Sequence, residues 1–404
     1  MAVGTLSMPS LKPIAGVTLG TAMAGIRRVD RRDLLVIMCE PGTTAAAGFT
    51  QSQFAAPPVI LARAHLARCA PRALVVNTGY ANAATGEHGF IDAQACCDAV
   101  AVLAQCTPEQ VLPFSTGVIG ERLPTARLIA GLPAAFATLR PDGWDDAAQA
   151  ILTTDTVPKG ASTTIPFPQG TVTLTGIAKG SGMIHPNMAT MLSFIATDIQ
   201  APASVLKSAL DIAMASTFNA ITVDGDTSTN DAVVLLATGQ SGIVMESSGA
   251  VFARFVAVLE EICMKLAHAI VRDGEGATKF IRVEVSGGRS VEECRVVANT
   301  IALSPLVKTA LFAGDPNWGR ILMAIGRAPI APLDVSRVVV SLNGIRVFMQ
   351  GAVDPSYKEE FGQKALAGDD ITIHVDLGHG ASAARVYTCD LSHEYVRING
   401  SYRT

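Results

Sequence analysis

The chain has 404 residues, which is more than one ordinary small domain needs and enough to bury a sizeable core. Hydrophobic residues make up 49% of the chain and charged residues 16%, and the formal net charge is −4. This near-neutral balance excludes the strong basic footprint of a nucleic-acid or anionic-membrane binder, so we expect small or zwitterionic ligands.

Targeting and metal-binding signals are also missing from the sequence. The opening residues, MAVGTLSMPSLKPIAG, do not place an apolar segment after a basic one, as a secretory signal would. No stretch approaches the roughly 18 uninterrupted apolar residues of a membrane-spanning helix. The eight cysteines form no CxxC pair and the seven histidines no HExxH motif. We therefore expect buried free thiols in a reducing compartment, no bound metal, and a cytoplasmic protein.

Short apolar or alternating segments predict β-strands along the whole chain. The clearest of them are residues 34–38, 74–76, 171–175, 281–285 and 371–377. Between residues 340 and 347, the pair Asn343-Gly344 separates two arms of high β-propensity. This pattern is typical of a tight hairpin.

The clearest predicted helix covers residues 250–271, where apolar side chains recur every three or four positions. Gly274 is expected to end this helix and to place Glu275 just beyond it. Residues 92–106 and 203–218 also favour helices.

This alternation of helices with antiparallel-type strands predicts an α+β fold, with helices layered on mixed sheets. The sequence shows no internal repeat, and residues 166–170 are the nearest feature to a boundary. We expect one intertwined unit, or two lobes that share a sheet system.

The segment from Lys179 to Leu192, KGSGMIHPNMATML, is the most informative. Its lysine precedes its glycines, which is not the order of a phosphate-binding P-loop. A small residue, Ala189, stands before a hydroxyl residue, Thr190, where a turn meets a strand-like run. Self-cleavage needs this arrangement, and a new terminal Thr190 would hold a nucleophile and an amine base with an ordinary pKa of about 7.7–8.0. Spacing alone, however, favours the simpler interpretation that these residues open a strand.

The same string resembles the cleavage motif of the ornithine acetyltransferase family, the glutamate N-acetyltransferases of arginine biosynthesis. Six further segments are similar to the family in chain order, so that the resemblance covers nearly the whole sequence. They are residues 77–86, 115–120, 153–159, 219–231, 306–320 and 395–404. The resemblance implies an N-terminal-nucleophile fold in which self-cleavage turns Met1–Ala189 into an α chain and Thr190–Thr404 into a β chain. The two chains would intertwine in one protomer and assemble as an α₂β₂ heterotetramer.

The resemblance also implies a reaction. Thr190 would accept acetyl from N2-acetyl-L-ornithine, release ornithine, and pass the acetyl group to L-glutamate. Thr116 and Gly117 would form the oxyanion hole, although the glycine also fits a tight turn after a strand over residues 111–114. The implied substrate contacts are Thr153, Lys179, Thr190, Glu275, Asn399 and Thr404. Among them, Glu275 suits the ornithine ammonium and Lys179 suits a carboxylate.

Other interpretations stay open at this point. The acidic segment 224–231 lacks the spacing of a calcium loop, so we expect a hydrogen-bonded turn there. No cofactor is implied, and the sequence does not decide whether acetyl-CoA also serves as a donor. A related hydrolase or aminopeptidase would use water or a peptide in place of glutamate. A second alternative is an uncleaved relative that only binds its ligand.

Overall fold

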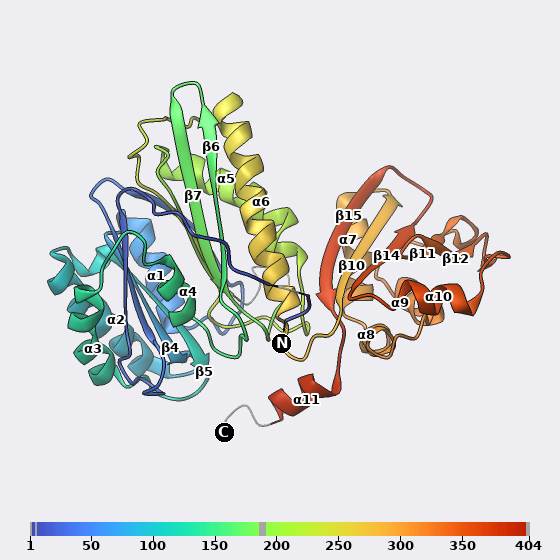
Figure 1. Ribbon diagram of the computed structural model, residues 1–404, viewed down its shortest axis with the longest axis horizontal. Helices are drawn as coiled ribbons and strands as arrows, with labels where there is room; N and C mark the ends of the chain where they lie inside the picture. Colours follow the sequence, from blue (N-terminus) through green and yellow to red (C-terminus); the bar gives the residue numbers. More distant parts are fainter. Residues whose placement is uncertain (1, 5, 186–190, 401–404) are drawn as a thin grey trace. The chain divides into compact units, whose positions relative to one another are not determined.

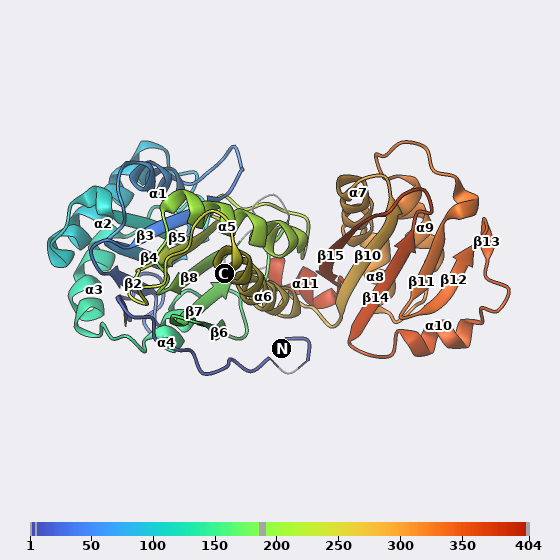
Figure 2. The same cartoon turned by 90° about the horizontal axis from the view of Figure 1, so that it is seen from above.

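The computed structural model describes residues 2–4, 6–185 and 191–400. These residues form two compact units, which we describe separately (Figures 1 and 2). The large unit comprises Ser7–Asn219 and Asp226–Ile270, and the small unit comprises Met1–Leu6, Ala220–Gly225 and Val271–Thr404.

Two β-sheets face each other in the large unit. The first has the strand order β1-β2-β4-β5, and the second has the order β3-β9-β8-β7-β6. The strands of the first sheet are β1 Val17–Ala22, β2 Leu34–Cys39, β4 Ala73–Tyr80 and β5 Val111–Val118. Those of the second are β3 Thr44–Phe49, β6 Lys159–Phe167, β7 Gly170–Lys179, β8 Leu192–Thr197 and β9 Ala232–Ala237.

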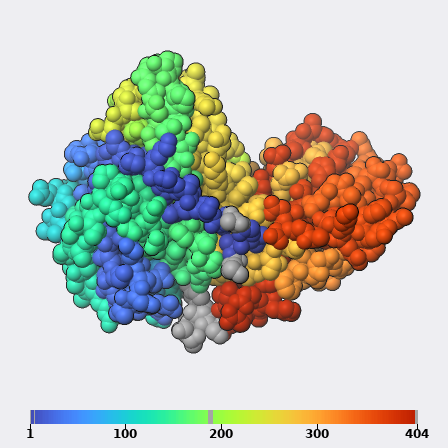
Figure 3. Space-filling model, in the orientation of Figure 1, coloured from blue at the N-terminus to red at the C-terminus, as the bar shows by residue number. Residues whose placement is uncertain are grey.

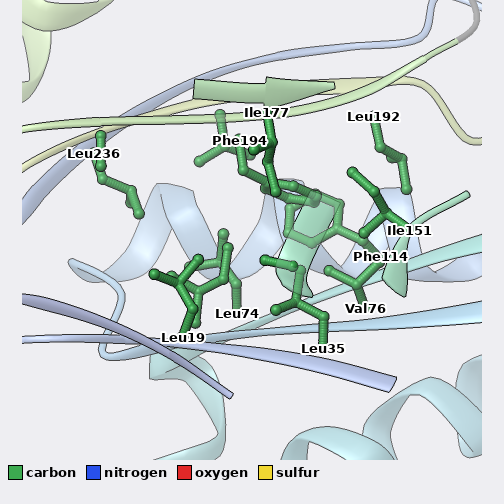
Figure 4. Packing of buried hydrophobic residues seen from close by; sticks show 14 of the residues in the cluster. Leu19, Leu35, Leu74, Val76, Phe114, Ile151, Ile177, Leu192, Phe194 and Leu236 are labelled. Atoms are coloured by element: carbon green, nitrogen blue, oxygen red, sulfur yellow. The ribbon is translucent and has the colours of Figure 1, made fainter. Parts of the chain in front are cut away.

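Apolar side chains from both sheets fill the space between them. Figure 4 shows Leu35 and Leu74 of the first sheet opposite Ile177 of the second. Phe114 on β5 meets Phe194 on β8 edge to face, with ring centroids 5.2 Å apart. Because helices cover the other face of each sheet, strands such as β2 and β9 are apolar on both sides, which explains their near-continuous hydrophobic sequences.

Helices form the outer layers of the large unit. Helices α1 Pro57–Arg68, α2 Gly86–Ala104 and α3 Thr125–Ala137 pack on the first sheet. Helices α5 Ala203–Ser216 and α6 Ala250–Arg272 cover the second (Figure 1). The short helix α4 Trp144–Ala150 contacts strands of both sheets, and the turns η1 Pro108–Gln110 and η2 Phe218–Ala220 are 3₁₀-helical. The unit is therefore layered helix, sheet, sheet, helix.

The segment before β1 runs along the surface of the second sheet. The Lys12 N–H donates to Ser162 Oγ at 3.1 Å, and Thr175 Oγ1 donates to the Lys12 carbonyl at 2.7 Å. In Figure 3 this dark-blue segment crosses the green strands. These bonds fasten the beginning of the chain to β6 and β7.

The small unit is built on one six-stranded sheet of order β13-β12-β11-β14-β10-β15. Its strands are β10 Phe280–Gly288, β11 Val339–Leu342, β12 Ile345–Met349, β13 Ala352–Val353, β14 Asp370–Asp376 and β15 Ser382–Cys389. Its helices are α7 Val291–Ala302, α8 Pro305–Phe312, α9 Trp318–Gly326, η3 Val335–Arg337, α10 Glu359–Ala365 and α11 His393–Asn399. Its own apolar core joins the sheet to α7, α8 and α9.

Most of the predicted elements are confirmed. The five expected strands are β2, β4, β7, β10 and β14, and Asn343-Gly344 makes the turn between β11 and β12. The helix predicted over residues 250–271 is α6, and α5 matches the segment 203–218. The helix expected over residues 92–106 is α2, which already begins at Gly86. The α+β class with helices on mixed sheets is also confirmed.

The boundaries of the two units lie elsewhere than the nearest boundary feature in the sequence. Residues 166–170 mark no boundary, because they close the β6–β7 hairpin, in which Pro166 pairs with Thr171 beside the turn. A proline is tolerated there because the strand is ending. The lobes do not share a sheet system either, since each unit has its own sheets and core.

Two further observations bear on the expected environment. All eight cysteines are free thiols; six are buried as expected, whereas Cys69 and Cys106 are partly exposed. Among the described residues, the helices include none that is long and apolar enough to cross a membrane.

Candidate active site

Thr116 and Gly117 lie within β5, in the parallel pairing with β4. Thr116 pairs with Thr78, and Gly117 with Gly79. The tight turn considered after residues 111–114 is therefore wrong, because the strand continues to Val118. Gly117 has a φ of +135°, and a Cβ there would lie 2.2 Å from the Gly79 carbonyl carbon. The close approach of β4 is thus what requires a glycine at this position.

Lys179, the last residue of β7, reaches across from the second sheet to Thr116. Its Nζ lies 3.1 Å from Thr116 Oγ1, and each of the two residues is only 8% exposed. The structure therefore brings together two of the predicted site residues, which lie 63 positions apart in the chain.

A buried carboxylate, Asp155, lies at the same place and was not among the predicted site residues. Its Oδ1 accepts hydrogen bonds from Lys159 Nζ and from the Gly180 N–H, both at 2.7 Å. Its Oδ2 accepts from the N–H of Thr153 at 3.1 Å, which ties a third predicted residue to this cluster. The side chains of Asp155 and Lys159 are 0% exposed.

The charge of Asp155 follows from these neighbours. Burial by itself would raise the pKa of the carboxyl group, because a charged group is disfavoured away from water. The Lys159 and Lys179 ammonium groups and the two donors to Oδ1 outweigh this effect and hold the pKa of Asp155 well below its usual range. The carboxyl group is therefore ionised at neutral pH. The only sequence signal for it was the spacing of Asp155 and Lys159 inside the segment 153–159.

Two amide side chains fix the strand that carries Thr116. Ser115 Oγ donates to Asn77 Oδ1 at 2.6 Å. Asn230 Nδ2 donates to the Ser115 carbonyl at 3.0 Å and to the Ala81 carbonyl at 2.6 Å. These bonds satisfy the hydroxyl and carbonyl groups of Ser115, directly before Thr116, and so help to hold the end of β5 in place.

The acidic segment 224–231 does not form one turn. Asp224 belongs to the small unit, where Tyr395 Oη donates to its carboxylate at 3.2 Å, whereas Asn230 belongs to the large unit. The chain passes from one unit to the other within the segment, so the expectation of a single hydrogen-bonded turn was wrong. Across the described residues, no group of three His, Cys, Asp or Glu side chains could hold a metal ion.

In the small unit, Glu275 and Asn399 meet. Glu275 is 7% exposed, and Asn399 Nδ2 donates to its Oε2 at 2.7 Å. Asn399 lies on α11, which begins after the helix cap Ser392. Ser392 Oγ also donates to the carbonyl of Gly276 at 2.6 Å, so that the same side chain fastens the loop after Glu275.

A second carboxylate completes this fastening. Asp390 accepts from the N–H groups of Thr278 and Lys279 at 2.7 and 2.8 Å, and from Thr278 Oγ1 at 2.6 Å. We call residues 390–392, with these bonds, the C-terminal clasp. The clasp accounts for the meeting of Glu275 and Asn399, which lie 124 positions apart.

Ala189, Thr190 and Thr404 lie outside the described residues. The strand-like run expected after Thr190 is confirmed from Leu192 onward as β8. Lys179 at the end of β7 pairs directly with Leu192 at the start of β8. Strand β7 therefore ends at Lys179, and β8 begins at Leu192 directly opposite it.

Comparisons with known proteins agree with the family resemblance. The chain matches the ArgJ family model over residues 18–404. It is 54% identical to the arginine biosynthesis bifunctional protein ArgJ of Methylococcus capsulatus, over 99% of this chain and 98% of that protein. It is 48% identical to the protein of the same name from Pseudomonas syringae pv. tomato, over the full length of both. A crystal structure of the arginine biosynthesis bifunctional protein argJ from Bacillus halodurans is 40% identical, with a TM-score of 0.51 over 53% of this chain and 100% of the solved chain. The chain therefore belongs to the ArgJ family.

Proposed function

We propose that this chain transfers acetyl from N2-acetyl-L-ornithine to L-glutamate, as a glutamate N-acetyltransferase of arginine biosynthesis. The observation that carries the proposal is the near full-length match to relatives named as bifunctional proteins of arginine biosynthesis. Family membership makes the chain an acyltransferase of that pathway. The site described above supplies the polar groups that such a transfer needs.

Self-cleavage at Ala189-Thr190 would come first. The Thr190 hydroxyl oxygen adds to the Ala189 carbonyl carbon, the C–N bond breaks, and the acyl group is left as an ester on Thr190. Water then hydrolyses the ester to give the Ala189 carboxylate and a free Thr190 amine. The match in length to the Bacillus halodurans chain supports this step, because Thr190–Thr404 would be 215 of 404 residues, or 53% of this chain.

Acetyl transfer would then proceed in two halves. The Thr190 amine takes the proton of its own hydroxyl group as the oxygen attacks the acetyl carbonyl of acetylornithine. The C–N bond breaks, the proton goes to the leaving amine, and ornithine departs from an acetyl-Thr190 ester. The α-amine of glutamate attacks this ester in the second half, and Thr190 is restored. The Thr116 hydroxyl and the Gly117 N–H would stabilise the oxyanion in both halves.

The remaining predicted residues would bind the amino acids. We assign the buried Glu275 to the ornithine ammonium, because charge-assisted hydrogen bonds are the stronger kind. Lys179 would face a carboxylate, and Thr153, Asn399 and Thr404 would complete the contacts. Asn399 is already beside Glu275.

The proposal extends to donors and assembly. No bound cofactor is required, because Thr190 itself carries the acetyl group, and acetyl-CoA would serve as a second acetyl donor at the same hydroxyl. The word bifunctional in the relatives' names supports this second use. We further propose an α₂β₂ heterotetramer in the cytoplasm, which rests on the family resemblance.

A denaturing mass spectrum with N-terminal sequencing tests the cleavage. We expect two chains, the second beginning Thr-Met-Leu-Ser-Phe, and exchange of labelled acetyl between acetylornithine and glutamate. Thr190→Ala should give one chain and no exchange. Ser193→Ala is the matched control, since it removes a nearby β8 hydroxyl group that, within the described part of the chain, donates to the Ile177 carbonyl at 3.0 Å. This variant should still cleave and exchange.

The alternatives predict different results. Cleaved protein that releases free acetate or cleaves peptides, without exchange, would indicate the hydrolase or aminopeptidase. A single inert chain that binds acetylornithine would indicate a binding protein. Either result would overturn the proposal.

A further inference from the structure

The bond between Lys179 and Thr116 has a fixed direction. An ammonium group donates hydrogen bonds and has no lone pair with which to accept one, whereas a threonine hydroxyl can do both. At 3.1 Å, Lys179 Nζ must therefore be the donor and Thr116 Oγ1 the acceptor. The hydrogen of the Thr116 hydroxyl is left to point toward another group. The positive charge beside the oxygen also makes that hydroxyl group a stronger donor.

Asp155 stabilises this arrangement of Lys179 in two ways, through a backbone hydrogen bond and through its charge. Its Oδ1 accepts the N–H of Gly180, the residue that follows Lys179, at 2.7 Å. This bond fixes the backbone from which the lysine side chain extends. Its negative charge also stabilises the ammonium of Lys179, which is 8% exposed and would otherwise be disfavoured by burial.

Other charged groups surround the carboxylate. Lys159 bonds to Asp155 at 2.7 Å, and the Lys179 ammonium interacts electrostatically with the same buried carboxylate. The Arg31 guanidinium also interacts with Asp155, and with Asp33. Removing the Asp155 charge would leave positive groups facing one another, and the ammonium form of Lys179 would become less stable.

We propose that Asp155 and Lys179 are positioning residues for the Thr116 hydroxyl. Lys179 occupies an acceptor position of Thr116 and so directs the hydroxyl hydrogen at the oxyanion, while Asp155 keeps Lys179 in place and charged. This inference deepens the proposed function and rests on it. It adds a role to Lys179 beyond the substrate contact that the resemblance implied.

The inference predicts what happens when Lys179 loses its charge. A neutral amine can accept a hydrogen bond, so the Thr116 hydroxyl can turn toward it and is lost to the oxyanion. Losing one oxyanion donor typically lowers the rate on the order of 10²–10³-fold. Deprotonating Lys179 should therefore act on the same step as removing the Thr116 hydroxyl.

A double-mutant cycle tests this coupling. The measurement is the single-turnover rate of Thr190 acetylation by acetylornithine, followed by mass spectrometry on the cleaved fraction of Lys179→Met, Thr116→Val and the double variant. We expect each single variant to lose on the order of 10²–10³-fold in the maximal rate. Lys179→Met should raise KM as well, because it also removes the proposed carboxylate contact. The double variant should lose little more than Thr116→Val alone.

The pH profile tests Asp155 separately. In Asp155→Asn the alkaline limb of the acetylation rate should move to lower pH, because Lys179 then loses its proton more easily. Asp198→Asn is the matched control. Asp198 is another buried carboxylate of the large unit, and it accepts the N–H of Thr173 on β7 at 2.8 Å. Asp198→Asn should leave the alkaline limb of the acetylation rate at its original pH, even if this variant unfolds at a lower temperature.

Three results would overturn the inference while exchange by the unaltered protein still stood. The first is that the double variant loses acetylation rate by the product of the fold-losses of Lys179→Met and Thr116→Val. The second is that Lys179→Met raises only KM. The third is that Asp155→Asn keeps the original pH profile. If the methionine or valine variant fails to cleave, Lys179→Arg and Thr116→Ser replace them. Arginine still donates to residue 116 without accepting, and serine keeps the hydroxyl group, so each should retain most of the maximal rate, and a loss on the order of 10²-fold from either counts against the inference. No exchange by the unaltered protein would instead refute the proposed function.

Discussion

Replacing Gly117 with alanine should cost more than replacing Gly120, although both glycines have a positive φ. The values are +135° for Gly117 and +85° for Gly120. An L-residue in such a sparsely populated conformation costs roughly 1–3 kcal/mol, and both variants carry this strain. The two positions differ in what an added Cβ would meet.

At Gly117 the added Cβ would lie 2.2 Å from the carbonyl carbon of Gly79 and 2.4 Å from its oxygen, whereas at Gly120 nothing lies within 4 Å. The obstacle at Gly117 is backbone, so no rotamer change relieves it, and β4 and β5 must separate. Overpacking of this kind adds about 1–3 kcal/mol. We expect Gly117→Ala to lower the free energy of unfolding by roughly 2–6 kcal/mol in total, against about 1–3 kcal/mol for Gly120→Ala.

The rate of acetyl exchange should also differ between Gly117→Ala and Gly120→Ala. Parting the strands moves the Gly117 N–H away from the oxyanion, and the loss of one such donor is on the order of 10²–10³ in rate. Urea unfolding and acetyl exchange, measured on both variants, check the two effects. If Gly117→Ala unfolds at the same urea concentration as Gly120→Ala and exchanges acetyl normally, the close approach of β4 does not position the hole and our reasoning fails.

Three further variants test separate contacts. Glu275→Gln should raise KM for acetylornithine roughly tenfold, because a charge-assisted hydrogen bond becomes a neutral one; an unchanged KM would contradict the assignment, and cleavage should be normal. Ser392→Ala should lower the free energy of unfolding of the chain by about 1 kcal/mol, because it removes a helix cap and the bond to Gly276; Ser392→Thr should restore it. Burial alone would raise the pKa of Glu293, but its hydrogen bonds with Arg289 lower that pKa to about 2. The carboxylate therefore contributes stability above its unfolded pKa of about 4.3, and this contribution is lost as the pH falls through about 2. Glu293→Gln should destabilise the protein at pH 7 in urea unfolding and have little effect near pH 2, and an equal effect at both would refute this account.

Sequence patterns predicted the helices, strands and turns whose formation depends on residues close together in the chain. Alternation identified β7 and β10, the three-and-four spacing identified α6, and Asn343-Gly344 identified a hairpin, because periodicity and turn geometry are local properties. The family motifs pointed to Thr116 and Lys179, but not to their hydrogen bond. That bond depends on two sheets facing each other, which no local pattern encodes.

The missed features depend on contacts between distant segments. Asp155 looked like any acid in a polar stretch, and its importance comes from full burial between Lys159 and the N–H of Gly180. Gly117 fitted a turn equally well, since the sequence does not distinguish a glycine required by the close approach of a neighbouring strand from a glycine in a turn. The division into two units was missed because the chain enters the small unit briefly at residues 220–225, returns, and enters it again at Val271.

The five-stranded sheet explains how a break at Ala189-Thr190 would leave one protomer intact. Strands β3, β6 and β7 precede the expected cleavage position, and β8 and β9 follow it, yet all five belong to one sheet. Leu192 is held on both sides, by Lys179 of β7 and Ala232 of β9, two residues beyond Thr190. The Phe114–Phe194 contact likewise joins the two halves of the chain. Separating the halves would break these ladders and expose the core between the sheets, so the two halves would stay together after a break, with Leu192 still paired with Lys179.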